Sequence, residues 1–374
     1  MKGVALKVPF ADLARQFKTV MPEIQTAMTS VIDRCAFING PEVKQFEKDM
    51  ATWMGMPEVC AVSNCTVALE LTMQSMGIGP GDEVITVPNT AFPTAEAISL
   101  TGAQVVFADI KPGYFSIDPD QIEKKITPRT KAIIPVHLFG IAADMDRILS
   151  IGNKHSIPVI EDCAQAQGAR YKGNYVGTMG AAACFSFFPS KNLGTFGDGG
   201  AMTSPDTELI KKVWRLANHG RSDKFTHQVV GTNSRLDTIK AAQLSVCLRQ
   251  LDAWNADRRR AAALYGDLLK DCRNIILTKV PEGCEPIWHV YVIRHKRRDE
   301  LAAFLKKQGI DTGLHYPLGL HQQPVYAHLG LKPEDLPEAT AACAEVLSLP
   351  MFPFITEEEI TAVTDSIKAF CALE

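Results

Sequence analysis

The stretch that decides the fold reads Ala183-Cys184-Phe185-Ser186-Phe187-Phe188-Pro189-Ser190-Lys191-Asn192-Leu193-Gly194, and Gly197-Asp198-Gly199-Gly200 follows shortly after it. Its apolar first half predicts a buried β-strand, which Pro189 ends. Lys191 is then expected at a sheet edge, within a glycine-containing backbone that can approach a ligand closely. Apolar surroundings push a lysine toward its neutral amine, the form that attacks a carbonyl carbon. The ordinary alternative is a solvated lysine on a turn.

The composition is that of a globular protein. The chain has 374 residues, 46% of them hydrophobic, and a formal net charge of -3. That length suits two domains, or one large domain with an appendage. No basic tract favours nucleic acid or an anionic membrane surface, and no window is apolar enough for a signal peptide or a membrane span. We therefore expect a cytoplasmic protein with neither nucleic acid nor a membrane as partner.

The cysteines and histidines predict neither disulfides nor a metal site. The ten cysteines are scattered singly, without a Cys-x-x-Cys pair, and several lie in apolar runs. Reduced thiols are the better interpretation. The nine histidines never fall at metal-ligand spacing with one another or with those cysteines.

Strand and helix patterns alternate between about residues 55 and 205. Strands are expected at residues 59–62, 83–87, 103–108, 132–137, 157–161 and 183–188, with helices near 67–71, 94–100 and 145–149. Helices between buried strands indicate crossover connections and a largely parallel sheet covered on both faces. The sequence therefore predicts an α/β fold.

The pattern changes in the last third of the chain. One long helix is expected from about residue 236 to 270, with the run Arg258-Arg259-Arg260 as a solvated face. A strand at 290–294 and a helix at 301–305 follow, which is an α+β pattern. We predict a large domain over residues 1–250, including an N-terminal arm, and a smaller C-terminal domain over 251–374.

Three polar features follow predicted strands, where open α/β sheets bind their ligands. Asp162 ends one strand and Gln165 lies one turn further on; Ser186 and Lys191 lie on and after the next. Ser63-Asn64-Cys65-Thr66 opens a helix, whose free amides and positive dipole end suit a phosphate. Each has a simpler explanation alone, as a helix cap or a strand hydroxyl. Together they are the minimum set for pyridoxal phosphate: a lysine for the Schiff base, a carboxylate for the pyridinium nitrogen and an anion site.

The sequence resembles the DegT/DnrJ/EryC1/StrS family of sugar aminotransferases nearly from end to end. The matching segments are residues 37–43, 46–47, 161–169, 188–200, 231–237, 289–291, 315–317 and 347–351. The aspartate and lysine segments are the specific ones. The resemblance implies the aspartate aminotransferase fold (fold type I), with a mostly parallel seven-stranded sheet in the large domain.

The resemblance also implies a role for each cofactor residue. Lys191 matches the lysine that forms the Schiff base and later moves the proton, and Asp162 the acid that pairs with the ring nitrogen. Gln165 matches a side chain that hydrogen-bonds the 3-hydroxyl oxygen. The Cys65 and Thr66 amides and Ser186 match the phosphate cradle.

Further positions are implied at the subunit interface and near the substrate. Asn233 matches a residue that reaches the phosphate of the neighbouring subunit, so a homodimer is expected. His315, Tyr316 and His321 are candidate substrate contacts, since the small domain closes over the site in this fold. The alternative for all three is a loop that packs against the large domain.

Two positions depart from the family pattern. Cys65 stands where relatives usually have glycine in the cradle, but its amide still points outward and we expect phosphate binding to survive. Ala91 stands where many relatives place an aromatic residue that stacks on the cofactor ring. Phe92 is next to it but should face elsewhere, so the group that covers the ring stays open.

These features favour an aminotransferase that uses pyridoxal phosphate, and pyridoxamine phosphate between the half-reactions, in amino-sugar biosynthesis for a lipopolysaccharide or an antibiotic. The expected substrates are glutamate and a dTDP- or UDP-linked keto-sugar, with a 3-keto group favoured over a 4-keto group because of the lysine segment. A keto-cyclitol aminotransferase of antibiotic biosynthesis and a non-catalytic regulator remain alternatives. Lys191 argues against the family's dehydratases, which carry histidine there, and Ser190 argues against cysteine desulfurases, which have histidine before the lysine.

Overall fold

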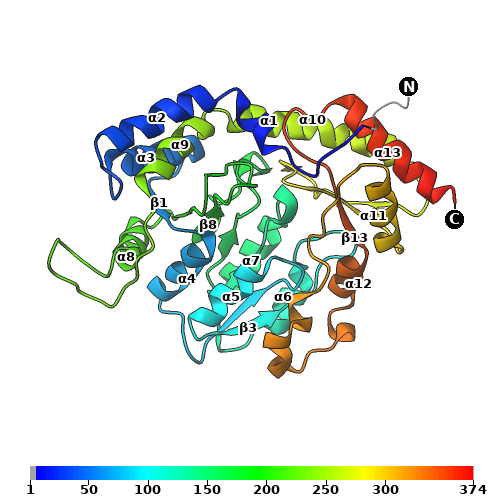
Figure 1. The fold of residues 1–374 in the computed structure, drawn as a ribbon. Coiled ribbons are helices and arrows are strands. Elements are labelled where there is room, and N and C mark those ends of the chain that lie inside the picture. The colour runs from blue at the N-terminus through cyan, green and yellow to red at the C-terminus, as the bar shows by residue number, and fades with distance from the viewer. Residues whose placement is uncertain (1–5, 374) are drawn as a thin grey trace.

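A central sheet organises the larger part of the chain in the computed structural model, which describes residues 6–373 (Figure 1). Four strands pair in the order β1-β9-β8-β5, and three in the order β3-β2-β4. Their bounds are β1 Val59–Val62, β2 Glu83–Thr86, β3 Gln104–Phe107, β4 Thr130–Ile134, β5 Ile160–Asp162, β8 Ala182–Ser186 and β9 Gly200–Thr203. Parallel bridges from Ile133 to Val159 and from Val136 to Asp162 join the two groups. The sheet therefore has seven strands, as expected, in the order β1-β9-β8-β5-β4-β2-β3.

The sheet is mostly parallel, and β9 is its exception. β9 pairs antiparallel with both β1 and β8, whereas β8–β5, β2–β3 and β2–β4 are parallel pairs. The sequence pattern does not predict β9, because its glycine-rich start is typical of a loop. The predicted strand at 183–188 ends two residues early, at Ser186, where the chain leaves the sheet toward Lys191.

Helices cover both faces of the sheet. Alternate strand residues point to opposite sides: Val84 and Ile134 join the cluster under α4 (Cys65–Ser75), α5 (Phe92–Leu100) and α8 (Thr207–Ala217). Ile85 and Ile133 join the cluster under α3 (Pro41–Met54), α7 (Met145–His155) and α9 (Thr238–Leu248). This three-layer α/β/α arrangement confirms the predicted fold class.

The single long helix expected from residue 236 to 270 is two helices. α9 ends at Leu248, and α10 (Leu251–Leu269) starts after Arg249 and Gln250. α9 is buried along most of its length against α2 (Met21–Asp33) and α3, whereas α10 leaves that core and runs into the C-terminal part. A change of burial environment therefore separates the helices where no glycine or proline marks a break.

The arginine run on α10 is not a solvated face throughout, which corrects the prediction. Arg258 is buried, and its Nη1 donates to the carbonyl oxygens of Trp288, His289 and Met351 at 3.4, 3.1 and 3.1 Å. Of the three, only Arg260 is exposed, and Arg259 is half-buried. The periodicity of a helix predicts which positions lie inward, but a guanidinium can lie there when backbone carbonyls accept its protons.

The C-terminal part is built on a separate antiparallel sheet, in the order β10-β12-β13. Its elements are β10 Ile276–Leu277, α11 Arg298–Lys307, β12 Tyr291–Arg294, α12 Pro337–Glu345, β13 Val346–Leu349 and α13 Glu357–Cys371. Val8, near the N-terminus, packs in the same apolar cluster and bridges to Ile310. The division at residues 250 and 251 stays a prediction, since Trp254 of α10 belongs to the large core and Tyr265 to the C-terminal one.

Shorter elements complete the fold. They are α1 (Leu13–Lys18), α6 (Pro119–Lys125), β6 (Arg170–Tyr171), β7 (Asn174–Tyr175), β11 (Cys284–Glu285) and the 3-10 helices η1 (Leu138–Gly140), η2 (Leu320–Gln322), η3 (Pro324–Leu329) and η4 (Pro333–Asp335). β11, β6 and β7 form a small antiparallel sheet.

Within residues 6–373, none of the helices has the length and apolar character needed to cross a membrane.

Candidate active site at the carboxyl ends of β5 and β8

Asp162 lies at the end of β5 and is almost completely buried. Its Oδ2 accepts a hydrogen bond from Thr94 Oγ1 at 2.8 Å, and its Oδ1 accepts one from the Ala164 amide at 3.0 Å. Burial raises the pKa of Asp162, while these hydrogen bonds and the charge of Lys191 oppose that rise. The carboxyl group is thus fixed in a dry place, where a proton on a partner nitrogen would stabilise its charged form.

Lys191 lies five residues beyond the end of β8, in the turn that its own amide closes onto the Phe188 carbonyl oxygen at 2.8 Å. Burial lowers the pKa of Lys191 to about 8, although the charge of Asp162 opposes this shift. Among residues 6–373, no side chain or carbonyl forms a hydrogen bond or ion pair with its Nζ. This partly buried amine has no partner among the described residues, and its lowered pKa makes its neutral form more populated near neutral pH than that of a solvated lysine. Such an amine fits a nucleophile better than a surface lysine.

The start of α4 lies beside these two side chains. Asn64 caps the helix by accepting from the Val67 amide at 2.9 Å, which leaves the Cys65 and Thr66 amides without a partner in the described part of the chain. The electrostatic influence of Asp162 and Lys191 reaches the Cys65 thiol, whose pKa burial raises well above its usual value. Two free amides at a helix N-terminus can hold a phosphate.

Gly200 brings Ser186 to the same place. Ser186 is paired with Gly200 across β8 and β9, and its own hydroxyl accepts weakly from the Phe188 amide at 3.3 Å. A Cβ on Gly200 would lie 2.4 Å from the Asn64 carbonyl carbon and 2.7 Å from the Cys65 amide nitrogen. This close approach requires glycine and places the Ser186 end of β8 next to the free amides of α4.

Gln165 and Tyr316 meet on another side of the site. Gln165 Oε1 accepts from the Phe139 amide at 2.8 Å, so its Nε2 is the end that donates to Tyr316 Oη at 3.2 Å. Burial raises the pKa of Tyr316 to about 12, and the phenol keeps its proton. The second hydrogen of Nε2 and the phenol proton are left for an oxygen of a bound molecule.

His315 lies against the same site from the C-terminal part. Its Nδ1 is 2.9 Å from Ser348 Oγ, and burial, with a smaller effect of the Lys191 charge, lowers its pKa to about 4. His321 does not join this group: its ring lies near Phe107 and its Nε2 is 3.3 Å from Thr340 Oγ1. The structure therefore brings together two of the three candidate substrate residues.

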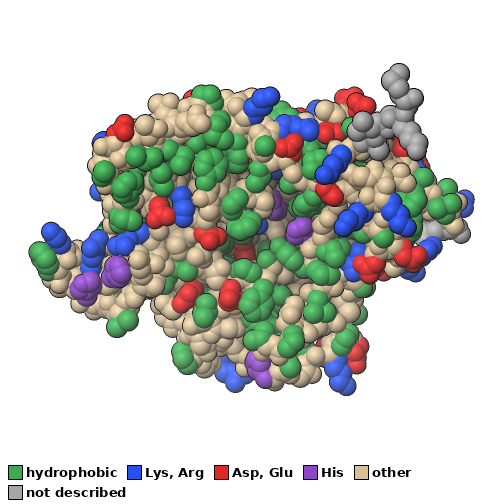
Figure 2. Space-filling model, in the orientation of Figure 1, with side chains coloured by type: hydrophobic (Ala, Val, Ile, Leu, Met, Phe, Trp, Pro, Cys, Tyr) green, Lys and Arg blue, Asp and Glu red, His purple; other side chains and the backbone are tan. Residues whose placement is uncertain are grey.

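Asn233 also lies apart from the site of its own chain. It is exposed, on the loop between α8 and α9, which projects from the body at the left of Figure 1. Figure 2 shows basic and histidine side chains gathered on that projection, and histidine in the hollow near the centre of the same face.

The ring-covering position is small. Ala91 is the N-cap of α5, and Phe92 packs toward Tyr326, with ring centroids 6.0 Å apart. Phe92 faces elsewhere, as expected, and the residue that covers a bound ring stays open.

Sequence reasoning missed the residues that hold the site from behind. Thr94 fixes Asp162, and Asn192 fixes the lysine turn by donating to Asn255 Oδ1 at 2.7 Å and lying 3.1 Å from His289 Nδ1. Asn192 could have been found, because a buried amide directly after a functional lysine needs partners. Thr94 carried no signal, since its helix is merely apolar.

A buried cluster lies directly behind Asp162. The ligand-type atoms of His137, Glu161 and Cys163 are within 4.8 Å of one another, which their spacing in the sequence did not reveal. The two oxygens of Glu161 accept from His137 Nε2 and from three backbone amides, those of Gly177, Met179 and Gly180, at 2.7 to 3.0 Å. Burial alone would raise the pKa of Glu161, but these hydrogen bonds lower it. A carboxylate with four donors is satisfied without a metal, and it anchors the chain next to Asp162.

Taken together, the residues fit pyridoxal phosphate. Lys191 offers an amine without a hydrogen-bond partner in the described part of the chain, and Asp162 offers a buried carboxyl group. Gln165 and Tyr316 offer donors, and the Cys65 and Thr66 amides offer an anion site. These are the groups needed for the aldehyde, the ring nitrogen, the ring oxygen and the phosphate. Cys65 costs nothing here, because only its amide is required.

Comparison with known proteins finds related sequences over nearly the whole chain. A pleiotropic regulatory protein of Geobacillus stearothermophilus is 46% identical, over 98% of this chain and 99% of its own. The dTDP-3-amino-3,4,6-trideoxy-alpha-D-glucose transaminase of Streptomyces venezuelae is 40% identical, over 97% and 96%. The UDP-2-acetamido-2-deoxy-3-oxo-D-glucuronate aminotransferase of Pseudomonas aeruginosa is 40% identical, over 98% and 99%.

Solved structures are similar over the same length. DesV of S. venezuelae, in complex with a ketimine intermediate, superposes with a TM-score of 0.96 at 39% identity and covers 98% of both chains. NtdA of Bacillus subtilis, with bound cofactor PMP, has a TM-score of 0.91 at 31% identity and covers 100% of this chain and 87% of its own.

Fold and site together define a pyridoxal-phosphate-dependent aminotransferase of fold type I. The model of the DegT/DnrJ/EryC1/StrS aminotransferase family matches residues 18–368, and the chain belongs to that family.

Proposed function

We propose that this enzyme transfers the amino group of glutamate to C3 of a dTDP- or UDP-linked 3-keto-sugar, as a cytoplasmic homodimer. The observation that carries the catalytic part is the partly buried Lys191 beside Asp162, whose amine has no hydrogen-bond partner within residues 6–373. The choice of C3 is supported by the names of the S. venezuelae and P. aeruginosa relatives, which refer to a 3-amino sugar and a 3-oxo sugar. No disulfide joins any two of the ten cysteines, which suits a reducing compartment.

The residues divide the chemistry between them. Pyridoxal phosphate, when bound, supplies a ring that accepts electrons from the carbon losing its proton. Asp162 would hold the proton at the ring nitrogen, and the neutral Lys191 Nζ would take the proton from the amine-bearing carbon and return it to the neighbouring one. The free amides of α4 and Ser186 would hold the phosphate while Lys191 is detached.

The projecting loop supports the dimer. Val230 is 97% exposed and Phe225 82% exposed, although both are apolar, and Asn233 lies on the same loop. Apolar side chains on a protruding loop are typical of a contact surface. In the proposed dimer they lie on the partner, and Asn233 reaches the partner's phosphate.

Mixing two inactive variants tests this arrangement. Lys191→Ala keeps Asn233, and Asn233→Asp keeps Lys191 but places a like charge beside the phosphate. One site of each mixed dimer then has both intact residues, so we expect activity to reappear when the variants are mixed, denatured and refolded together. If mixing restores nothing while each variant binds the wild-type subunit, Asn233 does not complete the partner's site.

The substrate is tested with sugars that differ only in the position of the ketone. Purified protein is incubated with glutamate and dTDP- or UDP-linked 3-keto- and 4-keto-sugars, and the amino-sugar product is identified by mass spectrometry and NMR. We expect product from the 3-keto-sugars. Product from the 4-keto-sugars alone would overturn the choice of C3 and leave the aminotransferase assignment standing.

A regulatory role is the second candidate, because the relative at 46% identity is named a pleiotropic regulatory protein. A purely regulatory protein predicts no visible absorbance from bound cofactor, and a Lys191→Ala variant with unchanged behaviour. The complete cofactor set around Lys191 favours the enzyme.

A further inference from the structure

His315 is held by contacts from three separate parts of the chain. Ser348 of β13 lies 2.9 Å from its Nδ1, and Tyr316 meets its ring edge-on at 5.5 Å between centroids. The ring of Phe10 lies over one face of the imidazole, with centroids 5.6 Å apart and planes inclined by 17°. A side chain on Gly313 would lie 2.9 Å from His315 Cε1 and 3.0 Å from Phe10 Cζ. The stack is therefore closely packed from behind.

Phe10 is fixed by its own segment. The Phe10 carbonyl oxygen accepts from the Met351 amide at 3.2 Å, and Val8, two residues earlier, bridges to Ile310. These contacts connect the N-terminal segment to two segments that lie next to the site. One precedes His315 and contains Ile310, and the other follows Ser348 and contains Met351.

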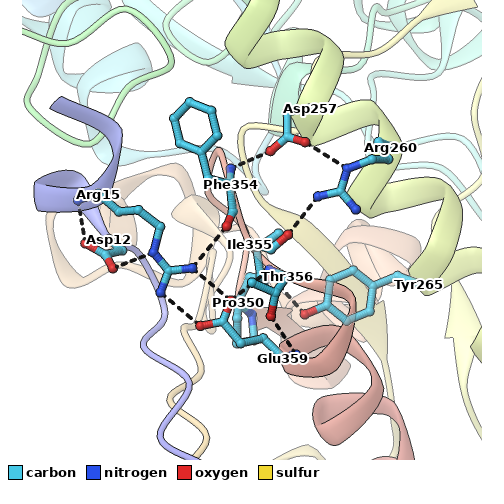
Figure 3. A network of polar contacts seen from close by, with 10 residues as sticks. All are labelled: Asp12, Arg15, Asp257, Arg260, Tyr265, Pro350, Phe354, Ile355, Thr356 and Glu359. Carbon is cyan, nitrogen blue, oxygen red and sulfur yellow. Dashed lines mark hydrogen bonds and ion pairs between the residues drawn. The ribbon is translucent and has the colours of Figure 1, made fainter. Parts of the chain in front are cut away.

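The segment is anchored again five residues further on (Figure 3). Arg15 forms a two-pronged pair with Glu359, with 2.9 Å for each contact, and donates to the Phe354 carbonyl oxygen at 3.0 Å. Arg260 of α10 donates to the Ile355 carbonyl oxygen at 2.7 Å. Residues 350–356 are thus held by hydrogen bonds from the N-terminal segment on one side and from α10 on the other. These hydrogen bonds fix the backbone against which Phe10 lies.

We propose that Phe10 is a positioning residue for His315: its ring fixes the plane of the imidazole at the substrate and keeps water from its face, so that the imidazole stays uncharged during catalysis. The proposal rests on the proposed function and on the sequence-based hypothesis that His315 contacts the sugar substrate. An uncharged imidazole can accept or donate a hydrogen bond to a sugar oxygen, whereas an imidazolium beside Lys191 would repel the amine's protonated form.

The charges around His315 agree with an uncharged ring. Lys191 faces it from the turn after β8, His289 from the chain before β12, and the Tyr316 phenol from its own segment. None of these is a carboxylate, so none stabilises an imidazolium. Burial, to which Phe10 contributes, is the main cause that lowers the pKa of His315 to about 4.

Phe10→Ala is the direct test. Opening one face of the ring to water should raise the pKa of His315 from about 4 toward 6.5, its ordinary value. We expect kcat to fall by about tenfold at neutral pH through loss of alignment. The loss should deepen as the pH falls from about 8 to about 5.5, because only the variant then forms the imidazolium. The wild-type enzyme should show no such additional acid limb.

Two variants separate positioning from general loosening. Phe10→Tyr keeps the ring and should restore the wild-type acid limb and most of kcat. Arg15→Ala loosens the same segment without contacting His315. It should lower Tm but leave the acid side of the pH profile of kcat unchanged. The proposal is overturned if the acid side of the kcat profile is unchanged in Phe10→Ala. It is also overturned if that part of the profile moves equally in Arg15→Ala.

A readout without activity keeps the test independent of the substrate. Diethyl pyrocarbonate acylates uncharged, accessible imidazoles, and peptide mass spectrometry reports the rate at His315 in the cofactor-loaded protein. We expect several-fold faster acylation in Phe10→Ala and the wild-type rate in Phe10→Tyr; equal rates in all three overturn the covering role of Phe10. If acylation responds as expected but His315→Asn aminates the sugar at the wild-type rate, the substrate role of His315 fails and the covering role stands.

Discussion

The two sides of the site are built in different ways. On the sheet side, Asp162, Ser186 and Lys191 come from one stretch of 30 residues and stand at the ends of neighbouring strands, β5 and β8. On the other side, His315 is held by Phe10 and Ser348, which are separated by most of the chain. The sheet side is aligned by backbone hydrogen bonds in register, and the other side by side-chain contacts between distant segments.

This difference assigns different tasks to the two sides. A group at the end of a parallel strand inherits the rigidity of the sheet, which suits the proton transfers at a fixed cofactor. A group held by side chains and by a partly exposed ion pair can open locally at lower free energy. We therefore expect variants on the sheet side to abolish chemistry, and variants on the other side to change stability, alignment and pH dependence.

The largest effect is expected on the sheet side, from Lys191→Ala. Removing the amine that moves the proton should lower kcat by at least about 10^3-fold, the usual contribution of an acid–base group together with a nucleophile. Single-turnover kinetics with glutamate measure it, and Lys240→Ala, which removes a lysine that pairs with Asp237, is the control. If kcat of Lys191→Ala stays within tenfold of the wild-type value, the sheet side does not carry the chemistry.

Asp162→Asn should have the next largest effect. The amide oxygen can still accept from the Ala164 amide, and the amide nitrogen can donate to the Thr94 hydroxyl, but the side chain carries no charge to hold a proton on the ring nitrogen. We expect kcat to fall by about 10^2- to 10^3-fold, as for other preorganised electrostatic groups, while the cofactor stays bound. A shift in the absorbance of the bound cofactor should accompany the loss; unchanged absorbance with unchanged kcat would show that another group protonates the ring.

The sheet side could be predicted from the sequence because its signals are local. Hydrophobic runs placed the strands, and the polar residues that end them, Asp162 and Lys191, follow from chain order alone. A mostly parallel sheet of seven strands was implied by the resemblance and is confirmed, whereas the order of the strands was not predicted. β9 escaped prediction because glycines are needed where Gly200 approaches the start of α4, and glycine reads as loop.

The other side could not be predicted because its contacts have no local pattern. Nothing near Phe10 in the sequence indicates a histidine about 300 residues away, and Arg258 looked solvated because its three carbonyl acceptors lie on distant segments. His321 stands close to Tyr316 in the sequence but is buried against Phe107 instead. Proximity along the chain was a poor guide where side chains, rather than strand register, set the geometry.

Arg15→Ala should give a moderate effect, and on stability rather than chemistry. The variant loses a two-pronged pair with Glu359, whose side chain is 8% exposed, so the free energy of unfolding should fall by about 2 kcal/mol. Burial alone would raise the pKa of Glu359, but the Arg15 hydrogen bond holds it below 4.5. The contribution of the pair is therefore present above pH 4.5 and is lost as the pH falls through the lowered pKa.

Urea unfolding at several pH values measures this contribution. The difference between Arg15→Ala and wild type should shrink in acid, and Glu359→Gln should reproduce most of the loss near neutral pH. A difference that is constant across the acid range would mean that the pair contributes little and that Arg15 stabilises the fold by packing over Phe352, from which its guanidinium carbon is 5.0 Å.

Ser186→Ala should have the smallest effect and sharpens the comparison most. The hydroxyl would give one hydrogen bond to the cofactor phosphate, worth about 1 kcal/mol, or roughly a fivefold weaker Kd. Ser204→Ala is the matched control: it loses a 2.7 Å hydrogen bond to the Ala181 carbonyl oxygen at the opposite end of β8 and should reduce stability without changing the Kd. Titrating each cofactor-free variant with pyridoxal phosphate gives the two Kd values to compare. If both variants bind the cofactor equally well, the phosphate is held by the α4 amides alone. The sheet then positions the site but makes no direct contact with the phosphate.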